Sequence, residues 1–454
     1  MAHHDLLIIG TGSGNSILAP EFDTLDVAIV ERGAFGGTCL NRGCIPSKML
    51  VYTADVALQA GHNARFGVDS QCNGVDWPAI RDRVFARIDP IAESGRNYRH
   101  SLDNVTVYEG DAHFVGHKTI AVNGEMVTAT SVVLAAGARP TIPDVPGLRD
   151  VEFHTSDSIM RVDAVPRRLV VIGGGFIACE LSHVFGAFGA HVTMIVRGDT
   201  LLRAEDDQIA MRYTELARAR SGFDLRCCTQ VLAARRVGDE VELDISTNGV
   251  HTSVRGDMVL VATGRVPNGT QLGVENTGVA MNPQGYVVTD PYLRTNVPGI
   301  WALGDICHAA QLKHAANADA RIVAHNLMHP ADLHAVDRRF LPHAVFGHPQ
   351  VASVGPTERA LALDGVPYVS STQHFSSTTY GWAMEDTTSF CKLLAHRDTR
   401  QLLGAHIIGP QASTLIQQLI QGMRFGQTVD EMARDQYYIH PALSEVVEQA
   451  LLEL

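Results

Sequence analysis

The chain has 454 residues, of which 45% are hydrophobic and 41 are glycine, and its formal net charge is −13. This length predicts about three domains, and the negative charge disfavours nucleic-acid binding, which requires basic surfaces. No apolar run reaches about 18 residues, and the first residues lack the basic region of a signal peptide, so we expect a cytoplasmic protein. Its eight cysteines are too few for a secreted disulfide scaffold, and structural disulfides are rare in that compartment, so a disulfide in this chain is expected to be catalytic or redox-sensing.

The first distinctive stretch is "DLLIIGTGSGNSILA", residues 5–19. It predicts a buried strand over Asp5–Ile9, a glycine turn and a helix, an arrangement that presents backbone N–H groups and the helix dipole to a phosphate. The glycines of the turn are Gly10, Gly12 and Gly14. The next strand, "VAIVE", ends in Glu31, at the distance where an acid typically accepts hydrogen bonds from an adenosine ribose. The pattern predicts a site for an unphosphorylated adenosine, as in FAD.

The stretch "GGTCLNRGCIPSK", residues 36–48, places Cys39 and Cys44 five positions apart. In a regular helix this spacing corresponds to about 7.5 Å of rise, at or beyond the Cα separation of about 7 Å that a disulfide tolerates. Gly43 and Pro46 interrupt a helix, so we expect the turn with Cys39 to be distorted and a regular helix to resume toward Lys48. The absence of CxxC spacing disfavours a metal site. A structural pair and a redox couple both remain open on spacing alone.

A second strand and glycine turn occur in "RLVVIGGGFIACE", with the strand over Leu169–Ile172 and the turn from Gly173 to Gly175. The following strand ends at Val196. Where the first unit has the acid Glu31, this unit has no acid but two cations, Arg197 and Arg203. Two cations at this place are typical of a 2′-phosphate site, which predicts NADPH. Each turn alone could be an ordinary strand–helix connection, and the arginines could be solvated surface charges.

Four later segments contain further candidate site residues. The stretches "SVVLAAGARP" and "DMVLVATGRVPN" each predict a strand that ends in a glycine, Gly137 and Gly264, close to an arginine. The strand in "PGIWALGD" is expected to end in Asp305, where an acid faces a ligand or caps a turn. Near the C-terminus, His440 and Glu445 could form an acid–base pair, or His440 could be an ordinary surface residue.

The order of these motifs over essentially the whole chain resembles that of the pyridine nucleotide–disulfide oxidoreductases. The resemblance implies an α/β fold with two Rossmann-like domains, the NADPH domain being inserted in the FAD domain, and an α+β C-terminal dimerisation domain. The implied boundaries give 1–145 and 270–337 to the FAD-binding and central part, 146–269 to the NADPH domain and 338–454 to the interface domain.

The resemblance also implies roles for individual residues. Electrons would pass from NADPH through FAD to a Cys39–Cys44 disulfide, with Cys44 as the thiolate next to the flavin and Cys39 as the thiol that attacks the substrate. His440 and Glu445 would act in the partner subunit's active site, which requires a homodimer. Lys48 and Glu180 would form an ion pair beside the flavin, and Phe176 would cover the nicotinamide pocket. Cofactor contacts are implied for Gly10, Gly12, Gly14, Glu31, Thr38, Gly137, Asp305, Gly173, Gly175, Arg197, Arg203 and Gly264.

The resemblance implies a low-molecular-weight disulfide as the class of substrate. Within the family, a C-terminus without cysteines disfavours mercuric reductases and large thioredoxin reductases, and Arg197 disfavours lipoamide dehydrogenases. Pro20 and Glu21 stand where a glutathione reductase would present an arginine on its first helix. The stretches "GTGSGNS", 312–327 and 380–386 resemble those of mycothione reductases, so mycothiol disulfide is the expected substrate. Glutathione disulfide and lipoamide remain alternatives, and a flavin-binding protein without turnover is a remote one.

The other cysteines carry no predicted function. Cys72, Cys179, Cys307 and Cys391 occur singly and are expected to be inert core residues. The adjacent pair Cys227 and Cys228 is expected to lie in a strand of the NADPH domain with a structural role.

Overall fold

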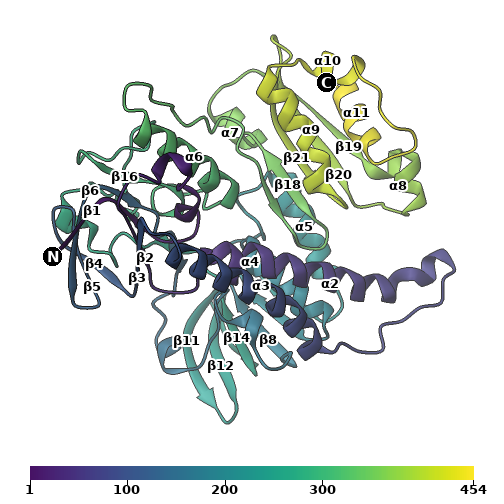
Figure 1. Cartoon of the computed structure of the whole chain (residues 1–454). Helices are drawn as coiled ribbons and strands as arrows, with labels where there is room; N and C mark the ends of the chain where they lie inside the picture. Colours follow the sequence, from purple (N-terminus) through teal and green to yellow (C-terminus); the bar gives the residue numbers. More distant parts are fainter.

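The computed structural model describes all 454 residues, and its first sheet is assembled from two distant segments of the chain (Figure 1). The strand order is β3-β2-β1-β6-β5-β4, and β16 pairs with β6 in parallel. Leu6–Ile9 are all buried, as expected for a central parallel strand with both faces covered. The strands are β1 (Ala2–Ile9), β2 (Val27–Glu31), β3 (Val105–Glu109), β4 (Ala112–Gly116), β5 (Thr119–Val122), β6 (Glu125–Leu134) and β16 (Ile300–Ala302).

The helix predicted after the first glycine turn is absent. Two short 3₁₀ turns, Gly14–Ser16 and Pro20–Phe22, connect β1 to β2 instead. Arg99 donates to both the backbone and the side-chain oxygen of Asn15, at 2.7 Å each, and so occupies a carbonyl that a helix would use. Pro20 disfavours helical geometry in the residue before it, and Ala19 is extended. Pro20 and Glu21 therefore lie on an exposed turn, not on a helix.

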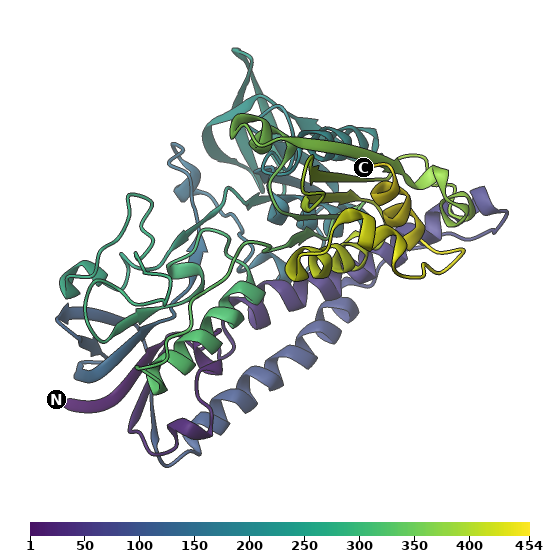
Figure 2. The ribbon, with the colours of Figure 1, turned by 90° about the horizontal axis from the view of Figure 1, so that it is seen from above.

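Two long helices follow, and they lie side by side (Figure 2). α1 (Gly37–Arg42) is a short helix directly before α2 (Cys44–His62), and α3 (Trp77–His100) begins after Asp76, whose carboxylate accepts a hydrogen bond from Ala79 N at 3.0 Å. The buried face of α2, including Leu50, packs in one core with α4 (Phe176–Ala187) of the second nucleotide unit. This contact sets the position of the N-terminal turn of α2.

The second unit has the predicted strand, glycine turn and helix. Its parallel sheet has the order β10-β9-β8-β14, and α4 begins directly after Gly175. An antiparallel sheet, β11-β12-β13, covers it. The elements are β8 (Arg168–Ile172), β9 (His191–Ile195), α5 (Asp207–Ala219), β10 (Phe223–Arg226), β11 (Thr229–Val237), β12 (Glu240–Thr247), β13 (Val250–Gly256) and β14 (Met258–Val261).

The segments of the chain that enter and leave this unit pair with each other as a two-stranded ribbon. β7 (Ala138–Pro140) pairs with β15 (Arg265–Pro267) in antiparallel fashion. The chain then returns through β16 to α6 (Lys313–Met328). Asp305 lies three residues beyond the last residue of β16, in the 3₁₀ turn Gly304–Ile306, and not at the end of the strand as expected.

The C-terminal segment forms a separate α+β unit with its own core (Figure 1). Its antiparallel sheet has the order β17-β18-β21-β20-β19. The elements are β17 (His343–Val345), β18 (Val351–Val354), α7 (Glu358–Leu363), β19 (Tyr368–His374), α8 (Thr379–Ala383), β20 (Phe390–His396), β21 (Leu402–Ile408), α9 (Ala412–Phe425), α10 (Val429–Arg434) and α11 (Ser444–Leu452). The predicted fold class is thus confirmed. None of the helices combines the length and apolar character needed to cross a bilayer.

The remaining helical turns are short 3₁₀ segments. They are Asn63–Phe66, Leu148–Asp150, Ile159–Arg161, Val274–Thr277 and Phe375–Ser377.

Candidate active site

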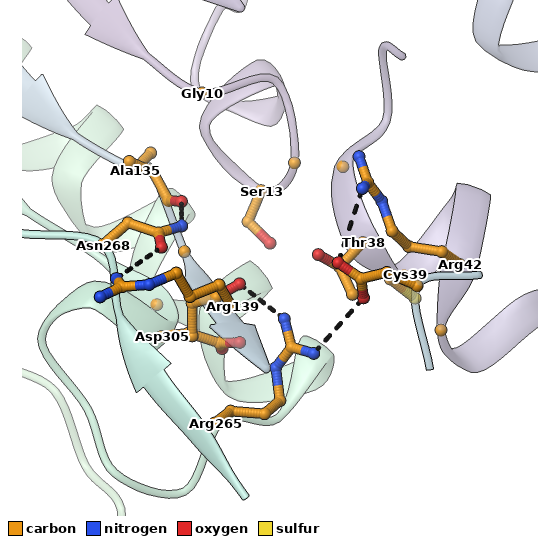
Figure 3. A pocket seen from close by; sticks show the side chains of 18 of the residues that line it. Gly10, Ser13, Thr38, Cys39, Arg42, Ala135, Arg139, Arg265, Asn268 and Asp305 are labelled. Atoms are coloured by element: carbon orange, nitrogen blue, oxygen red, sulfur yellow. Dashed lines mark hydrogen bonds and ion pairs between the residues drawn. The ribbon is translucent and has the colours of Figure 1, made fainter. Parts of the chain in front are cut away.

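A cavity of about 650 Å³ lies beyond the carboxyl ends of β1 and β6 (Figure 3). It brings together residues from the first glycine turn, α1, α2, α4, the β7–β15 ribbon and α6. The predicted site residues that line it are Gly10, Gly12, Glu31, Thr38, Cys39, Cys44, Lys48, Gly137, Phe176, Glu180 and Asp305. The predicted residues that do not line it are Gly14, Gly173, Gly175, Arg197, Arg203, Gly264, His440 and Glu445.

The wall next to β1 has the shape needed for close approach of a dinucleotide. Gly10 has φ +107°, and a Cβ there would collide with the carbonyl oxygen of Ala135. Gly12 faces Gly37 across the turn, so two backbones meet without side chains between them. At the end of β2, one carboxylate oxygen of Glu31 accepts hydrogen bonds from Thr11 N at 2.8 Å and Thr11 Oγ1 at 2.6 Å. These residues fit the phosphates and the ribose of an adenosine dinucleotide.

The two cysteines stand on either side of a helix break at Gly43, as expected, but the turn with Cys39 is helical and Pro46 lies in the first turn of α2 without interrupting it. Cys39 lies within α1, and Cys44 is the first residue of α2. Between them, a Cβ at Gly43 would lie 2.9 Å from the carbonyl oxygen of Thr38, so the tight approach requires glycine. A regular helix begins with the hydrogen bond from Ser47 N to Gly43 O at 3.0 Å. The break removes the helical rise that would keep the two thiols apart.

The two free thiols differ in acidity. A hydrogen bond from Cys39 lowers the pKa of Cys44 to about 7, against the opposing effect of burial and with help from the charge of Lys48. The same hydrogen bond and burial raise the pKa of Cys39 well above its usual value. In the reduced protein this difference favours the thiolate at Cys44 and the protonated form at Cys39.

An ion pair connects the first turn of α2 to α4. Lys48 Nζ lies 2.8 and 2.7 Å from the two carboxylate oxygens of Glu180. Glu180 is buried, and it also accepts a hydrogen bond from Phe346 N at 2.9 Å. The ammonium group lies 4.7 Å from the centre of the Phe346 ring. These contacts fix a positive charge next to Cys44.

His440 is held by a carboxylate and points outward from its own chain. Its Nδ1 lies 2.6 Å from Glu445 Oε1, and Ala442 N donates to the other carboxylate oxygen at 3.2 Å. The hydrogen bond with His440 lowers the pKa of Glu445. The imidazole is 69% exposed, whereas the Glu445 side chain is 12% exposed. Nε2 is thus available to a group outside this chain.

The second nucleotide unit presents an aromatic ring and two free cations. Phe176 is the first residue of α4, and its exposed ring lines the cavity. Arg197 and Arg203 follow β9, and both are exposed. Neither side chain has a hydrogen bond or ion pair, whereas most other arginines of the chain have one (for example Arg96 with Glu109). Unpaired guanidinium groups at this place suit a phosphate.

Several lining residues were missed by sequence reasoning. Arg265 donates to Ala138 O at 2.6 Å and lies 3.8 Å from Asp157, which also faces Arg42 at 3.6 Å (Figure 3). Arg139 donates to Asn268 Oδ1 at 3.2 Å. The arginines after Gly137 and Gly264 were visible as part of the glycine motifs, but nothing in the sequence singled out Arg42.

Two cysteine assignments differ from expectation. In the stretch 380–386, Tyr380 and Trp382 lie in α8, are exposed, and do not line the cavity of their own chain. Cys179 and Cys391 are buried and Cys307 is half-buried, but Cys72 is exposed and is not a core residue. Cys227 and Cys228 lie in the turn between β10 and β11, and not in a strand.

Comparison with known proteins now decides the family. The model described as "Pyridine nucleotide-disulphide oxidoreductase" matches residues 4–320, and the dimerisation domain of the same family matches residues 341–451. The chain belongs to the pyridine nucleotide-disulphide oxidoreductases. This membership confirms the expected enzyme class and the cofactors FAD and NADPH, and the second match supports the expected homodimer.

Individual members of the family are similar over the whole chain. Mycothione reductase of Mycobacterium tuberculosis (strain ATCC 25618 / H37Rv) is 45% identical, with 100% of both chains covered. Mercuric reductase of Staphylococcus aureus is 31% identical over 99% of this chain and 82% of its own length. Among solved structures, the HOCl-induced flavoprotein disulfide reductase RclA from Escherichia coli, in a Cu(II) complex, matches with a TM-score of 0.87 at 25% identity and 100% coverage of both chains.

The difference between the two thiols of this oxidoreductase can be measured by alkylation of the reduced protein. We expect the rate of Cys44 alkylation by iodoacetamide to rise with pH around a midpoint of about 7, because only the thiolate reacts. Cys39→Ala should move the midpoint upward, since it removes the largest cause of the low pKa. Cys39→Ser is the matched control, because its hydroxyl can still donate to Cys44. Equal midpoints in the Ala variant and the wild type would contradict this account.

We expect the nucleotide preference of the oxidoreductase to depend on Arg197 and Arg203. A hydrogen bond to a charged group contributes about 1.5–3 kcal/mol, so replacing both residues by Ala should raise the KM for NADPH by at least about tenfold. The KM for NADH should hardly change. Steady-state kinetics with both nucleotides checks this, and Arg212→Ala on α5 is the control for a lost surface charge. A wild-type enzyme that uses both nucleotides equally would argue against the assignment.

Proposed function

We propose that the enzyme reduces mycothiol disulfide (mycothione) to mycothiol with NADPH. The observation that carries this proposal is the full-length likeness to mycothione reductase, in which neither chain has an uncovered part. The paired thiols and the ion pair in the cavity agree with it, because a disulfide reductase needs a stabilised thiolate beside a protonated thiol.

We propose the following roles for the residues of the site. Bound FAD supplies the route by which a hydride from NADPH becomes the electron pair that opens a Cys39–Cys44 disulfide. Cys39 loses its proton to His440 of the partner subunit and attacks the substrate disulfide, which gives a mixed disulfide. The same histidine then protonates the leaving thiolate. Cys44 attacks the sulfur of Cys39, the second thiolate leaves and takes a proton from water, and the Cys39–Cys44 bond is restored.

The geometry supports this division of work. In the reduced protein the hydrogen bond from Cys39 favours the Cys44 thiolate, and in the mixed disulfide, where Cys39 has no proton to donate, the charge of Lys48 still favours the thiolate that resolves it. Cys39 is protonated and needs a base, and the exposed Nε2 of His440 can supply one only to another chain, because His440 does not line the cavity of its own chain. Glu445 holds the imidazole in one orientation.

We also assign the cofactor contacts and the domain boundaries from the motifs of the family. We assign the FAD contacts to the motifs around Gly10, Glu31, Thr38, Gly137 and Asp305, and the NADPH contacts to the motif of Gly173 and Gly175 with the two arginines after β9. The domains are 1–145 with 270–337, 146–269 and 338–454. The return of β16 to the first sheet and the β7–β15 ribbon support an inserted domain.

Substrate choice rests on charge. Glutathione disulfide carries several carboxylates, whereas mycothiol has a hydroxyl-rich sugar skeleton without a charge. Pro20 and Glu21 lie on an exposed turn and offer no cation there. Tyr380 and Trp382 are exposed on the interface domain, which also carries His440, so their rings are available to a sugar in the partner's cleft.

A panel of low-molecular-weight disulfides tests the proposed substrate. We expect kcat/KM for mycothiol disulfide to exceed that for glutathione disulfide by about a thousandfold or more, because a site built to hydrogen-bond hydroxyl groups rejects an analogue that lacks them. NADPH consumption at fixed enzyme concentration gives the values, with lipoamide as a third substrate. Similar values for glutathione disulfide, or a preference for lipoamide, would refute the proposal.

Mixed dimers test the position of His440. Cys39→Ser and His440→Ala subunits are each expected to be inactive, but a hybrid dimer has one site with both groups intact. Random exchange at equal amounts should therefore restore about a quarter of the wild-type activity. Mixing Cys39→Ser with Cys39→Ser/His440→Ala is the control and should restore none. If hybrid dimers form without activity, His440 does not act across the interface.

A further inference from the structure

Lys313 is a cation in an electrostatically unfavourable place. It is the first residue of α6, where the helix dipole already carries partial positive charge, and a lysine is normally favoured at the other end of a helix. Two lysines line the cavity: Lys48 is paired with Glu180, whereas Lys313 has no carboxylate within ion-pair distance. A positive charge added to a positive helix end inside a cavity is stabilised when the cavity holds an anion.

The ammonium group of Lys313 is held against the first glycine turn. Its Nζ donates to Ser13 Oγ at 2.9 Å, and Ser13 Oγ donates in turn to Asn317 Oδ1 at 3.0 Å, one helical turn along α6. Ser13 is buried between Gly12 and Gly14, and its side chain points into the cavity (Figure 3). An ammonium group has three donors, and Ser13 takes one. The others are available to a group at the glycine turn.

The two nucleotide units of this chain supply positive charge differently. In the second unit α4 starts directly after Gly175, so its N-terminal N–H groups and dipole are available at the glycine turn to bind phosphates. In the first unit no helix follows the turn, because the segment up to β2 contains only two 3₁₀ turns. The partial charge of about half a unit that a helix would contribute is therefore missing at the first turn. Lys313 brings a full charge to the same place from α6.

We propose that Lys313 binds the pyrophosphate of FAD and replaces the missing helix N-terminus of the first glycine turn. The proposal requires FAD binding, which family membership establishes, and it is independent of which disulfide is reduced. It makes Lys313 a positioning residue for the cofactor, with Ser13 as the group that holds the ammonium in place and α6 as its support.

An alternative position for the same charge is the flavin ring. The pKa of Cys39 is raised by its hydrogen bond with Cys44 and by burial, and the charge of Lys313 opposes both effects. The ammonium group is thus close enough to the cysteine pair to act on that side of the cavity as well. The experiment has to separate a contact to the pyrophosphate from a contact to the ring.

The experiment measures FAD binding directly. Holoenzyme variants Lys313→Met and Lys313→Arg are diluted, and FAD release is followed by the recovery of flavin fluorescence. Lys313→Met should weaken FAD binding by about 10- to 100-fold, the range for a lost hydrogen bond to a charged group, and Lys313→Arg should recover most of it. Arg321→Met is the matched control, since Arg321 is an exposed cation of the same helix without an ion pair or hydrogen bond, and it should bind FAD as the wild type does.

A second measurement identifies the part of FAD that is bound. With the flavin-free full-length protein, Lys313→Met should weaken the binding of ADP by the same factor and leave riboflavin binding unchanged. Lost riboflavin binding with normal ADP binding would overturn the proposal in favour of the ring.

Two further outcomes of the FAD-binding measurement would count against the assignments. Wild-type FAD affinity in Lys313→Met would refute it, while a wild-type protein that binds no FAD would instead refute the assigned cofactor. If Lys313→Met fails to fold, as judged by its thermal unfolding, Ser13→Ala replaces it. This variant should weaken ADP binding by a few fold without affecting riboflavin, and unchanged ADP binding would refute the proposal.

Discussion

The ion pair between Lys48 and Glu180 is the interaction on which the site depends. It joins residues 132 positions apart, one on the helix that starts with Cys44 and one on the helix of the second nucleotide unit. Because Glu180 is buried and also bonded to Phe346 N, the position of Lys48 is defined by three parts of the chain. Its charge then helps to keep Cys44 ionised. The packing of α2 on α4 therefore controls the chemistry of the cysteine as well as the arrangement of the units.

The break at Gly43 gives the two thiols different functions. In a continuous helix Cys39 and Cys44 would point to different sides, and neither could change the acidity of the other. With the break, one hydrogen bond lowers the pKa of Cys44 and raises that of Cys39. A single local feature of the backbone thus favours a thiolate at one cysteine and a protonated thiol at the other. In the proposed mechanism the protonated thiol requires an external base, and the exposed, carboxylate-held His440 on the interface domain is suited to that role.

The two glycine turns show that one motif can be completed in two ways. Both begin with a strand and a turn that admit a phosphate, but only the second continues into a helix. In the first, Arg99 from α3 takes the carbonyl group of Asn15, and α6 approaches the turn with Lys313 and Asn317. The electrostatic requirement of a phosphate site is the same in both turns, whereas the element that meets it differs.

The sequence by itself determined the strands of both nucleotide units, the break between Cys39 and Cys44 and the local pair of His440 with Glu445. These features depend on residues close together in the chain, where glycine, proline and apolar runs restrict the backbone directly. Tertiary structure decided the rest. The absence of the first helix reflects a hydrogen bond from Arg99, 84 residues away, as well as the local effect of Pro20, and the low pKa of Cys44 depends in part on how α2 packs on α4. Lys313 reaches the first turn from a distance of 300 residues, and no local pattern contains such a contact.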